Sequence, residues 1–181
     1  MQDFECRIYP RENRFARVHL IISGSCGIPK WISHHKKGAK VVAELPENWY
    51  KNNDLLGFVL YSLYDPLDNE SEETLENDAA YLKCSLTLRA HESQFVDELR
   101  FYPTFHCYDV VPNMWMIYYP KVEIEKYHSN KRRWRQLTAS FCGFLCGKAM
   151  KVEECGIHLI YAHDHEKNNG KAMIPTICQE C

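Results

Sequence analysis

Residues 23–64 read SGSCGIPKWISHHKKGAKVVAELPENWYKNNDLLGFVLYSLY and alternate turn-forming with strand-forming segments. Gly27 and Pro29 favour a tight turn, because glycine accepts positive φ and proline fixes φ. Two runs with strand character follow at 40–45 and 55–64. The second run is almost wholly apolar, which is typical of a central strand buried on both faces. The stretch contains no nucleophile–base pair, phosphate-binding loop or cluster of metal ligands.

Strand patterns continue through most of the chain and decide the fold class. Apolar and polar residues alternate most regularly at 81–89. Further strands are predicted at 17–22, 95–101, 105–110, 114–119, 122–125, 137–141, 150–154 and 157–162, with a hinge at 155–156 and helical turns at 29–33 and 47–50. The sequence therefore predicts an all-β fold, a two-sheet antiparallel β-sandwich of the jelly-roll or Ig-like type with short helical turns.

The composition indicates a folded domain with a sizeable core. Hydrophobic residues make up 45% and aromatic residues 13% of the 181 residues. The 22 Lys and Arg residues against 24 Asp and Glu residues give a net charge of −2, which removes the general electrostatic argument for binding nucleic acid. No apolar segment approaches the length of a membrane span, so no membrane partner is expected.

The nine cysteines bear on the compartment and on metal binding. Cys84, Cys107 and Cys142 fall within apolar strand patterns, where a free thiol behaves as a small apolar side chain. Without a signal segment we expect reduced thiols and an intracellular protein, in the cytoplasm, the nucleus or both. Only Cys178 and Cys181 have the short gap of a zinc-binding pair, so neither a metal nor a cofactor is expected.

Two charged segments stand out. Segment 65–79 carries seven acidic residues and no basic one, and 131–135 reads KRRWR. The acidic segment is interpreted first as a solvated loop. The basic segment is either an exposed strand edge protected by charge or a contact for RNA or another anion, with stacking on Trp134. A surface contact between the two segments is a further interpretation.

Four phrases of the sequence together resemble a known family. GSCGIPKWIS, ELPENWY, LLGFVLYSLY and CGIHLIYAHD resemble the C-terminal jelly-roll/Ig-like domain of plant intracellular immune receptors, over about residues 15–164. Those receptors carry a TIR domain, a nucleotide-binding domain and leucine-rich repeats, and this domain follows the repeats. The matched residues are interpreted as a scaffold motif of turn and core residues: Gly27, Pro29, Trp31, Trp49, Gly57, Phe58, Gly156 and His158.

The resemblance implies a non-enzymatic domain that binds a pathogen effector protein beside the repeats of the same receptor. Recognition would allow the receptor to oligomerise and its TIR domain to hydrolyse NAD⁺. It also implies three parts of the chain: a lead-in from the repeats at 1–14, the sandwich at 15–164 and a tail at 165–181. A carbohydrate- or lipid-binding jelly roll is the alternative, and a hydrolase using Cys or His is a third interpretation.

Loops are the expected place for effector contacts, because loop composition is least constrained by packing. We therefore expect contacts on the segments 65–79, 102–115 and 127–135. The candidate contact residues are charged or aromatic: Asp68, Glu70, Glu72, Glu73, Tyr102, Tyr108, Trp115, Lys131, Arg132, Arg133 and Trp134.

Overall fold

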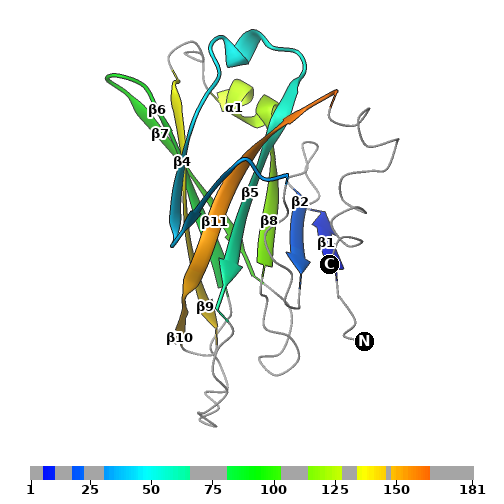
Figure 1. Ribbon diagram of the computed structural model, residues 1–181, viewed down its shortest axis with the longest axis vertical. Coiled ribbons are helices and arrows are strands. Elements are labelled where there is room, and N and C mark those ends of the chain that lie inside the picture. Colours follow the sequence, from blue (N-terminus) through cyan, green and yellow to red (C-terminus); the bar gives the residue numbers. More distant parts are fainter. Residues whose placement is uncertain are drawn as a thin grey trace.

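The computed structural model describes residues 6–10, 18–22, 31–65, 81–102, 114–127, 134–145 and 148–163. Their strands form two sheets that face each other, and neighbouring strands within each sheet are antiparallel (Figure 1). The predicted all-β sandwich is confirmed.

The first sheet has six strands in the order β1-β2-β8-β5-β11-β3. Strand β5, the apolar run predicted at 55–64, lies in the middle between β8 and β11. The bounds are β1 Cys6–Pro10, β2 Val18–Ile22, β3 His34–Lys37, β5 Leu55–Tyr64, β8 Met114–Pro120 and β11 Val152–Tyr161.

The second sheet has five strands. The order is β10-β9-β6-β7, and β4 also pairs with β9. The bounds are β4 Lys40–Glu44, β6 Tyr81–Arg89, β7 Gln94–Phe101, β9 Gln136–Leu145 and β10 Lys148–Met150.

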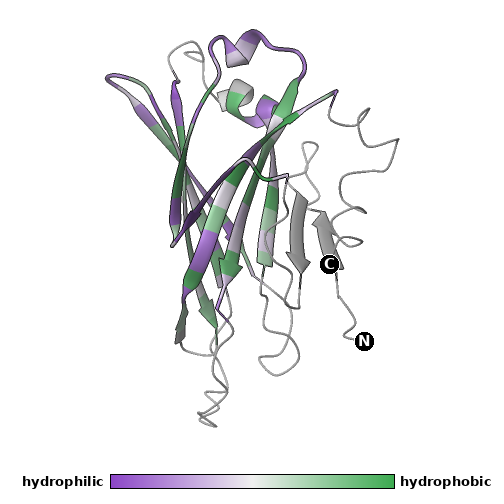
Figure 2. Cartoon of the chain, in the orientation of Figure 1, coloured by the Kyte–Doolittle hydropathy of each residue, from purple (hydrophilic) through white to green (hydrophobic). Residues whose placement is uncertain are grey.

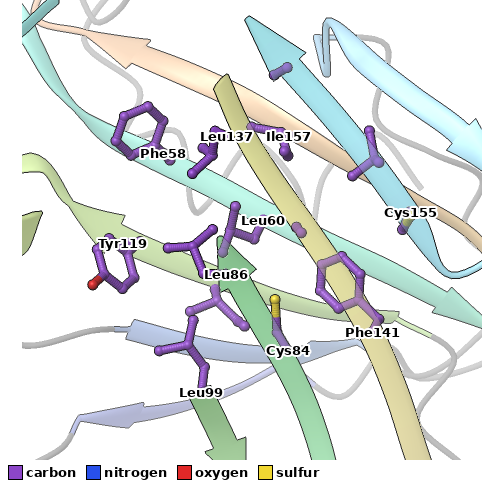
Figure 3. Close-up of a cluster of buried hydrophobic side chains, with 14 of the residues drawn as sticks. Phe58, Leu60, Cys84, Leu86, Leu99, Tyr119, Leu137, Phe141, Cys155 and Ile157 are labelled. Carbon is purple, nitrogen blue, oxygen red and sulfur yellow. The ribbon is translucent and has the colours of Figure 1, made fainter. Parts of the chain in front are cut away.

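The main core lies between the two sheets and is built from alternate residues of the facing strands. Phe58 and Leu60 of β5 point into it, as do Leu86 of β6 and Leu137 of β9, all with no exposed surface (Figure 3). Tyr119 reaches from β8 toward β7, and its hydroxyl donates to Asp97 Oδ2 at 2.8 Å. This hydrogen bond joins the two sheets.

A second apolar cluster lies on the opposite face of the six-stranded sheet. It consists of outward residues of β5, β8 and β11 together with the segment that leads into β3, and its buried members are Ile32, Val59, Tyr61, Met114, Met116 and Ile160. The sheet is therefore buried on both faces at β5, as the continuous apolar run predicts. Figure 2 shows this run as mainly hydrophobic and the tip of the β6–β7 hairpin as hydrophilic.

Two short helices close one end of the sandwich. The 3₁₀ turn η1 spans Trp49–Lys51, near the helical turn predicted at 47–50, and α1 spans Lys121–Tyr127. Lys121 Nζ donates to the backbone oxygen of Asn52 at 2.7 Å, which links the two helices. Figure 1 shows both at the upper end of the molecule.

The strand predicted at 122–125 is wrong, because α1 occupies these residues. A strand would place Val122 and Ile124 on the same face. Val122 is instead 38% exposed and Ile124 is fully buried, because a helix turns by about 200° over two residues. Two apolar residues in so short a segment fit either period.

The hinge predicted at 155–156 is also wrong. Strand β11 runs without a break through Cys155 and Gly156, which pair with Ser62 and Tyr61 of β5. Glycine serves here to make room for a neighbouring side chain and not to turn the chain. Of the turn predicted at 29–33, residues 29 and 30 lie outside the described residues, as does the strand predicted at 105–110.

Three described cysteines are free thiols: Cys84, Cys142 and Cys155. Cys84 and Cys155 are buried in the core. Cys142 is exposed and faces outward on β9, so its interpretation as a small apolar side chain within an apolar strand pattern is wrong. Cys107 lies outside the described residues.

The predicted domain boundaries stay predictions. Strand β1 lies within the lead-in proposed at 1–14 and pairs with β2 at the edge of the first sheet. The tail proposed at 165–181 lies outside the described residues.

Candidate functional site

Two of the candidate segments, the acidic segment 65–79 and the aromatic segment 102–115, are attached at the same end of the sandwich. Leu63, near the end of β5, pairs with Met114 at the start of β8. Leu82, near the start of β6, pairs with Phe101 at the end of β7. Residues 66–80 and 103–113 are therefore attached to four neighbouring strand ends, at the lower end of the molecule in Figure 1.

The basic candidate segment is attached at the opposite end. It lies between α1 and the start of β9, where Gln136 pairs with Glu44 and with Arg89. A ten-residue strand such as β5 is about 33 Å long. The acidic and basic segments are thus attached at opposite ends of the sandwich, and the contact between them stays a prediction, because residues 66–80 and 128–133 lie outside the described residues.

Burial rules out two candidate contact residues. Trp115 is fully buried, because it points inward from β8 between Phe101 and Phe141, with ring centroids 6.4 Å and 6.3 Å away. Trp134 is 5% exposed, and its backbone oxygen accepts a hydrogen bond from Trp49 Nε1 at 3.1 Å. The predictions of surface contacts at Trp115 and of base stacking on Trp134 are therefore wrong.

Tyr102 is available for contact. It follows β7 directly and its side chain is 53% exposed. The pKa of the Arg100 guanidinium is raised above its ordinary value, mainly by the neighbouring Tyr102 hydroxyl and next by Glu98. Tyr102 thus lies where the aromatic segment leaves the sandwich. The remaining candidate contact residues lie outside the described residues and stay predictions: Asp68, Glu70, Glu72, Glu73, Tyr108, Lys131, Arg132 and Arg133.

Two of the scaffold residues are aromatic core residues. Trp49 is 2% exposed and Phe58 fully buried, and their rings meet edge to face at 6.4 Å between centroids. Since Trp49 also bonds the backbone at Trp134, it fastens the start of β9 to the η1 turn. Gly27 and Pro29 lie outside the described residues.

The two scaffold glycines each make room for a tyrosine on the outward face of the six-stranded sheet. A Cβ atom at Gly156 would collide with the ring of Tyr61, its cross-strand partner. A Cβ atom at Gly57 would lie 2.6 Å from the backbone oxygen of Tyr119 and 2.9 Å from Cε2 of Tyr118. Both positions require glycine for packing, so we assign Gly57 and Gly156 to the scaffold motif and not to a binding site.

Trp31 and His158 form the remaining part of the scaffold motif. Their rings meet edge to face at 5.1 Å, and Nδ1 of His158 is 3.3 Å from Ser33 Oγ. His34 Nδ1 is 3.4 Å from the same oxygen. Ser33 Oγ therefore lies within hydrogen-bonding distance of two imidazoles, so the sequence prediction that residues 23–64 contain no such hydroxyl–imidazole pair is wrong. We interpret the cluster as the packing that fixes the start of β3 on β11.

The described buried thiols are poor nucleophiles. Burial raises the pKa of Cys155 to about 12, with a further contribution from Glu154. Burial also raises the pKa of Cys84 well above its ordinary value. Because the thiolate is the reactive form, neither group fits a cysteine hydrolase.

Residues 33–36 of the β3 segment and 40–42 of β4 line an open groove of about 640 Å³. Its lining contains serine, histidine, lysine and valine and no Phe, Tyr or Trp. In the described part of the chain, no three His, Cys, Asp or Glu side chains are grouped to hold a metal ion. None of the described helices has the length and apolarity needed to cross a membrane.

Comparison with known proteins identifies the family of this chain. Disease resistance protein RUN1 of Vitis rotundifolia is 33% identical over 163 residues, which are 84% of this chain and 12% of that protein. Disease resistance protein RPV1 of the same species is 29% identical over 164 residues, which are 84% of this chain and 11% of that protein. No solved structure matches the chain significantly. The C-JID domain model matches residues 24–166, from just after β2 to just after β11, and the chain belongs to the C-JID domain family.

Proposed function

We propose that this chain is the effector-recognition domain of an intracellular plant disease-resistance receptor. The C-JID match and the two Vitis rotundifolia relatives named as disease resistance proteins support this proposal. In it, the sandwich follows the leucine-rich repeats of the same receptor, in the cytoplasm, the nucleus or both. A pathogen protein binds the sandwich beside the repeats, and the receptor then oligomerises. NAD⁺ hydrolysis belongs to a TIR domain elsewhere in that receptor.

The positions of the strand ends indicate where the effector would contact the domain. Segments 66–80 and 103–113 are attached at one end of a rigid two-sheet scaffold, and Tyr102 is exposed beside them. A protein partner that covers this end meets residues from both segments. Exposed tyrosine is a frequent contributor to binding energy in protein interfaces.

Recognition without catalysis fits the described part of the domain better than its alternatives. A carbohydrate- or lipid-binding jelly roll uses an enclosed pocket with aromatic or apolar lining. The groove beside β3 is open and lacks aromatic lining residues other than histidine. The two buried thiols have raised pKa values, which disfavours a cysteine hydrolase.

Segment exchange in a full-length receptor tests the proposal. Residues 66–80 and 103–113 are replaced, separately and together, by the aligned segments of one Vitis rotundifolia relative, and effector-dependent cell death is measured in leaves. We expect the exchanges to abolish or redirect recognition. Exchange of the β6–β7 turn at 90–93, which lies at the opposite end, is the matched control and should leave recognition intact.

The folded state must be measured beside recognition. Each exchanged 181-residue chain should keep its cooperative thermal unfolding, because the exchanged segments lie outside the described strands. Unchanged recognition after the double exchange, with unfolding also unchanged, would contradict the proposal.

A further inference from the structure

We propose that the edge formed by β3 and β4 binds an acidic, extended segment of a partner protein. This surface lies along the side of the sandwich. It is not at the end to which residues 66–80 and 103–113 are attached. It therefore goes beyond the proposed effector contact and does not depend on it.

Both strands offer an open backbone edge. Among the described strands, β3 pairs with β11 alone and β4 with β9 alone. The two strands are joined by a turn at Gly38, whose φ of 92° suits glycine, and Gly38 N donates to the oxygen of Glu153 at 2.7 Å. The groove of about 640 Å³ lies between the strands. An extended peptide can bind such an edge by adding main-chain hydrogen bonds to it.

The charge on this edge is basic and not neutralised by neighbouring acids. Lys36, Lys37 and Lys40 are exposed, and no described acidic side chain forms an ion pair with them. The chain as a whole has a net charge of −2, so this surface departs from the average. With His34 and His35, five of the seven residues from 34 to 40 are lysine or histidine.

Two carboxylates beside this edge contact other side chains of the domain. Glu154 Oε1 is 2.7 Å from His35 Nδ1. Glu44 accepts a hydrogen bond from Gln136 Nε2 at 2.8 Å. The three lysines are therefore available to carboxylates from outside the domain.

The outward face of β4 adds an apolar contact between charges. Lys40, Val42 and Glu44 alternate with buried Val41 and Ala43, and Val42 is 44% exposed. An extended ligand presents alternate side chains to one face. A segment that alternates acidic and apolar residues would place carboxylates near the lysines and an apolar side chain near Val42.

Lysines on an edge strand also have a common protective role, because they keep two edges from pairing. That role alone predicts that removal of the lysines causes self-association and that no ligand binds. The open groove beside the strands and the exposed valine favour a bound segment.

Binding of a defined probe to the 181-residue chain tests the inference. The probe is a blocked peptide of about eight residues that alternates Glu and Val, and its control alternates Gln and Val. We expect the Glu peptide to shift the backbone amide resonances of β3 and β4 in NMR spectra and to bind more weakly as salt is raised. The Gln peptide should bind at least about tenfold more weakly.

Charge-matched variants then locate the site. Lys36→Gln/Lys37→Gln/Lys40→Gln should weaken the Glu peptide by about tenfold. Lys51→Gln/Arg135→Gln/Lys151→Gln removes the same charge elsewhere and should weaken it far less. Equal weakening by the two triple variants would overturn the inference. Self-association of the first variant, with no peptide binding to the unchanged chain, would assign the lysines to edge protection alone and also overturn it.

A second pair of variants keeps the lysines. Val42→Asp places a carboxylate beside the groove, whereas Val96→Asp changes a valine of similar exposure, 47%, on β7. Only Val42→Asp should weaken the peptide, with thermal unfolding alike in both. Equal binding of a single-stranded RNA at β3 and β4 would overturn the assignment to an acidic protein segment.

Discussion

The central strands of the two sheets are buried in different ways. On β5, residues 57–62 are buried on both faces, and Tyr61 on the outward face is as fully buried as Leu60 on the inward face. On β6, buried and partly exposed residues alternate without exception from Tyr81 to Leu88. One sheet of this sandwich is therefore packed on two faces and the other on one. The two sheets should therefore differ in what they tolerate.

A buried charge should give the largest difference between them. Met116→Lys places an ammonium in the outward cluster, where Met116 is 3% exposed, and should lower the free energy of unfolding by at least about 3 kcal/mol. Thr87→Lys adds the same charge to the partly exposed face of β6 and should change it by less than about 0.5 kcal/mol. Urea denaturation measures both.

Similar costs for the two lysine variants would break the comparison. In that case the outward face of the first sheet would tolerate water at Met116, and its burial would not contribute to stability.

An added methyl group at Gly156 should have a smaller but specific effect. Gly156→Ala forces the ring of Tyr61 to move, and overpacking of this kind costs about 2 kcal/mol. Combined with Tyr61→Ala, the same glycine substitution should cost less, because the colliding ring is gone and only the approach of the added Cβ to the backbone oxygen of His34, at 2.7 Å, remains. A double-mutant cycle by urea denaturation gives the coupling, and additive costs would contradict the packing role of this glycine.

Removal of the hydroxyl that joins the two sheets should have the smallest effect. Tyr119→Phe deletes the hydrogen bond to Asp97 and should cost about 1 kcal/mol. Tyr50→Phe deletes an exposed hydrogen bond to Asn48 Oδ1, 3.2 Å long, and serves as the control. A loss at Tyr119 no greater than at Tyr50 would show that the buried bond adds nothing.

Strands with a strong hydrophobic period could be predicted from the sequence. The alternation at 81–89 and the apolar run at 55–64 correspond to β6 and β5 with the same bounds. Strand β3 was missed because HHKK contains no apolar residue, so its pairing with β11 leaves no trace in the hydrophobic pattern. The sequence predicts its neighbour β11 in two pieces, because Gly156 resembles a turn residue. The packing of Tyr61 against Gly156, which explains the glycine, cannot be read from the sequence.

The candidate site could be predicted only in part. The sequence indicates which segments lie between strands, but the strand order decides which of them meet, and that order depends on pairing between distant residues. Residue type was also insufficient, since Trp115 and Trp134 are suited to an interface and serve packing here. Alternation along β8 would have placed Trp115 with Ile117 and Tyr119, and this signal was available.

Hydrogen–deuterium exchange on the receptor, with and without an effector that it recognises, tests the central claim most directly. We expect slower exchange in peptides covering 65–81 and 102–114, which leave one end of the sandwich, and little change in the β6–β7 turn at the other end. Protection confined to the η1 and α1 end, or none in this domain during effector binding, would contradict the claim.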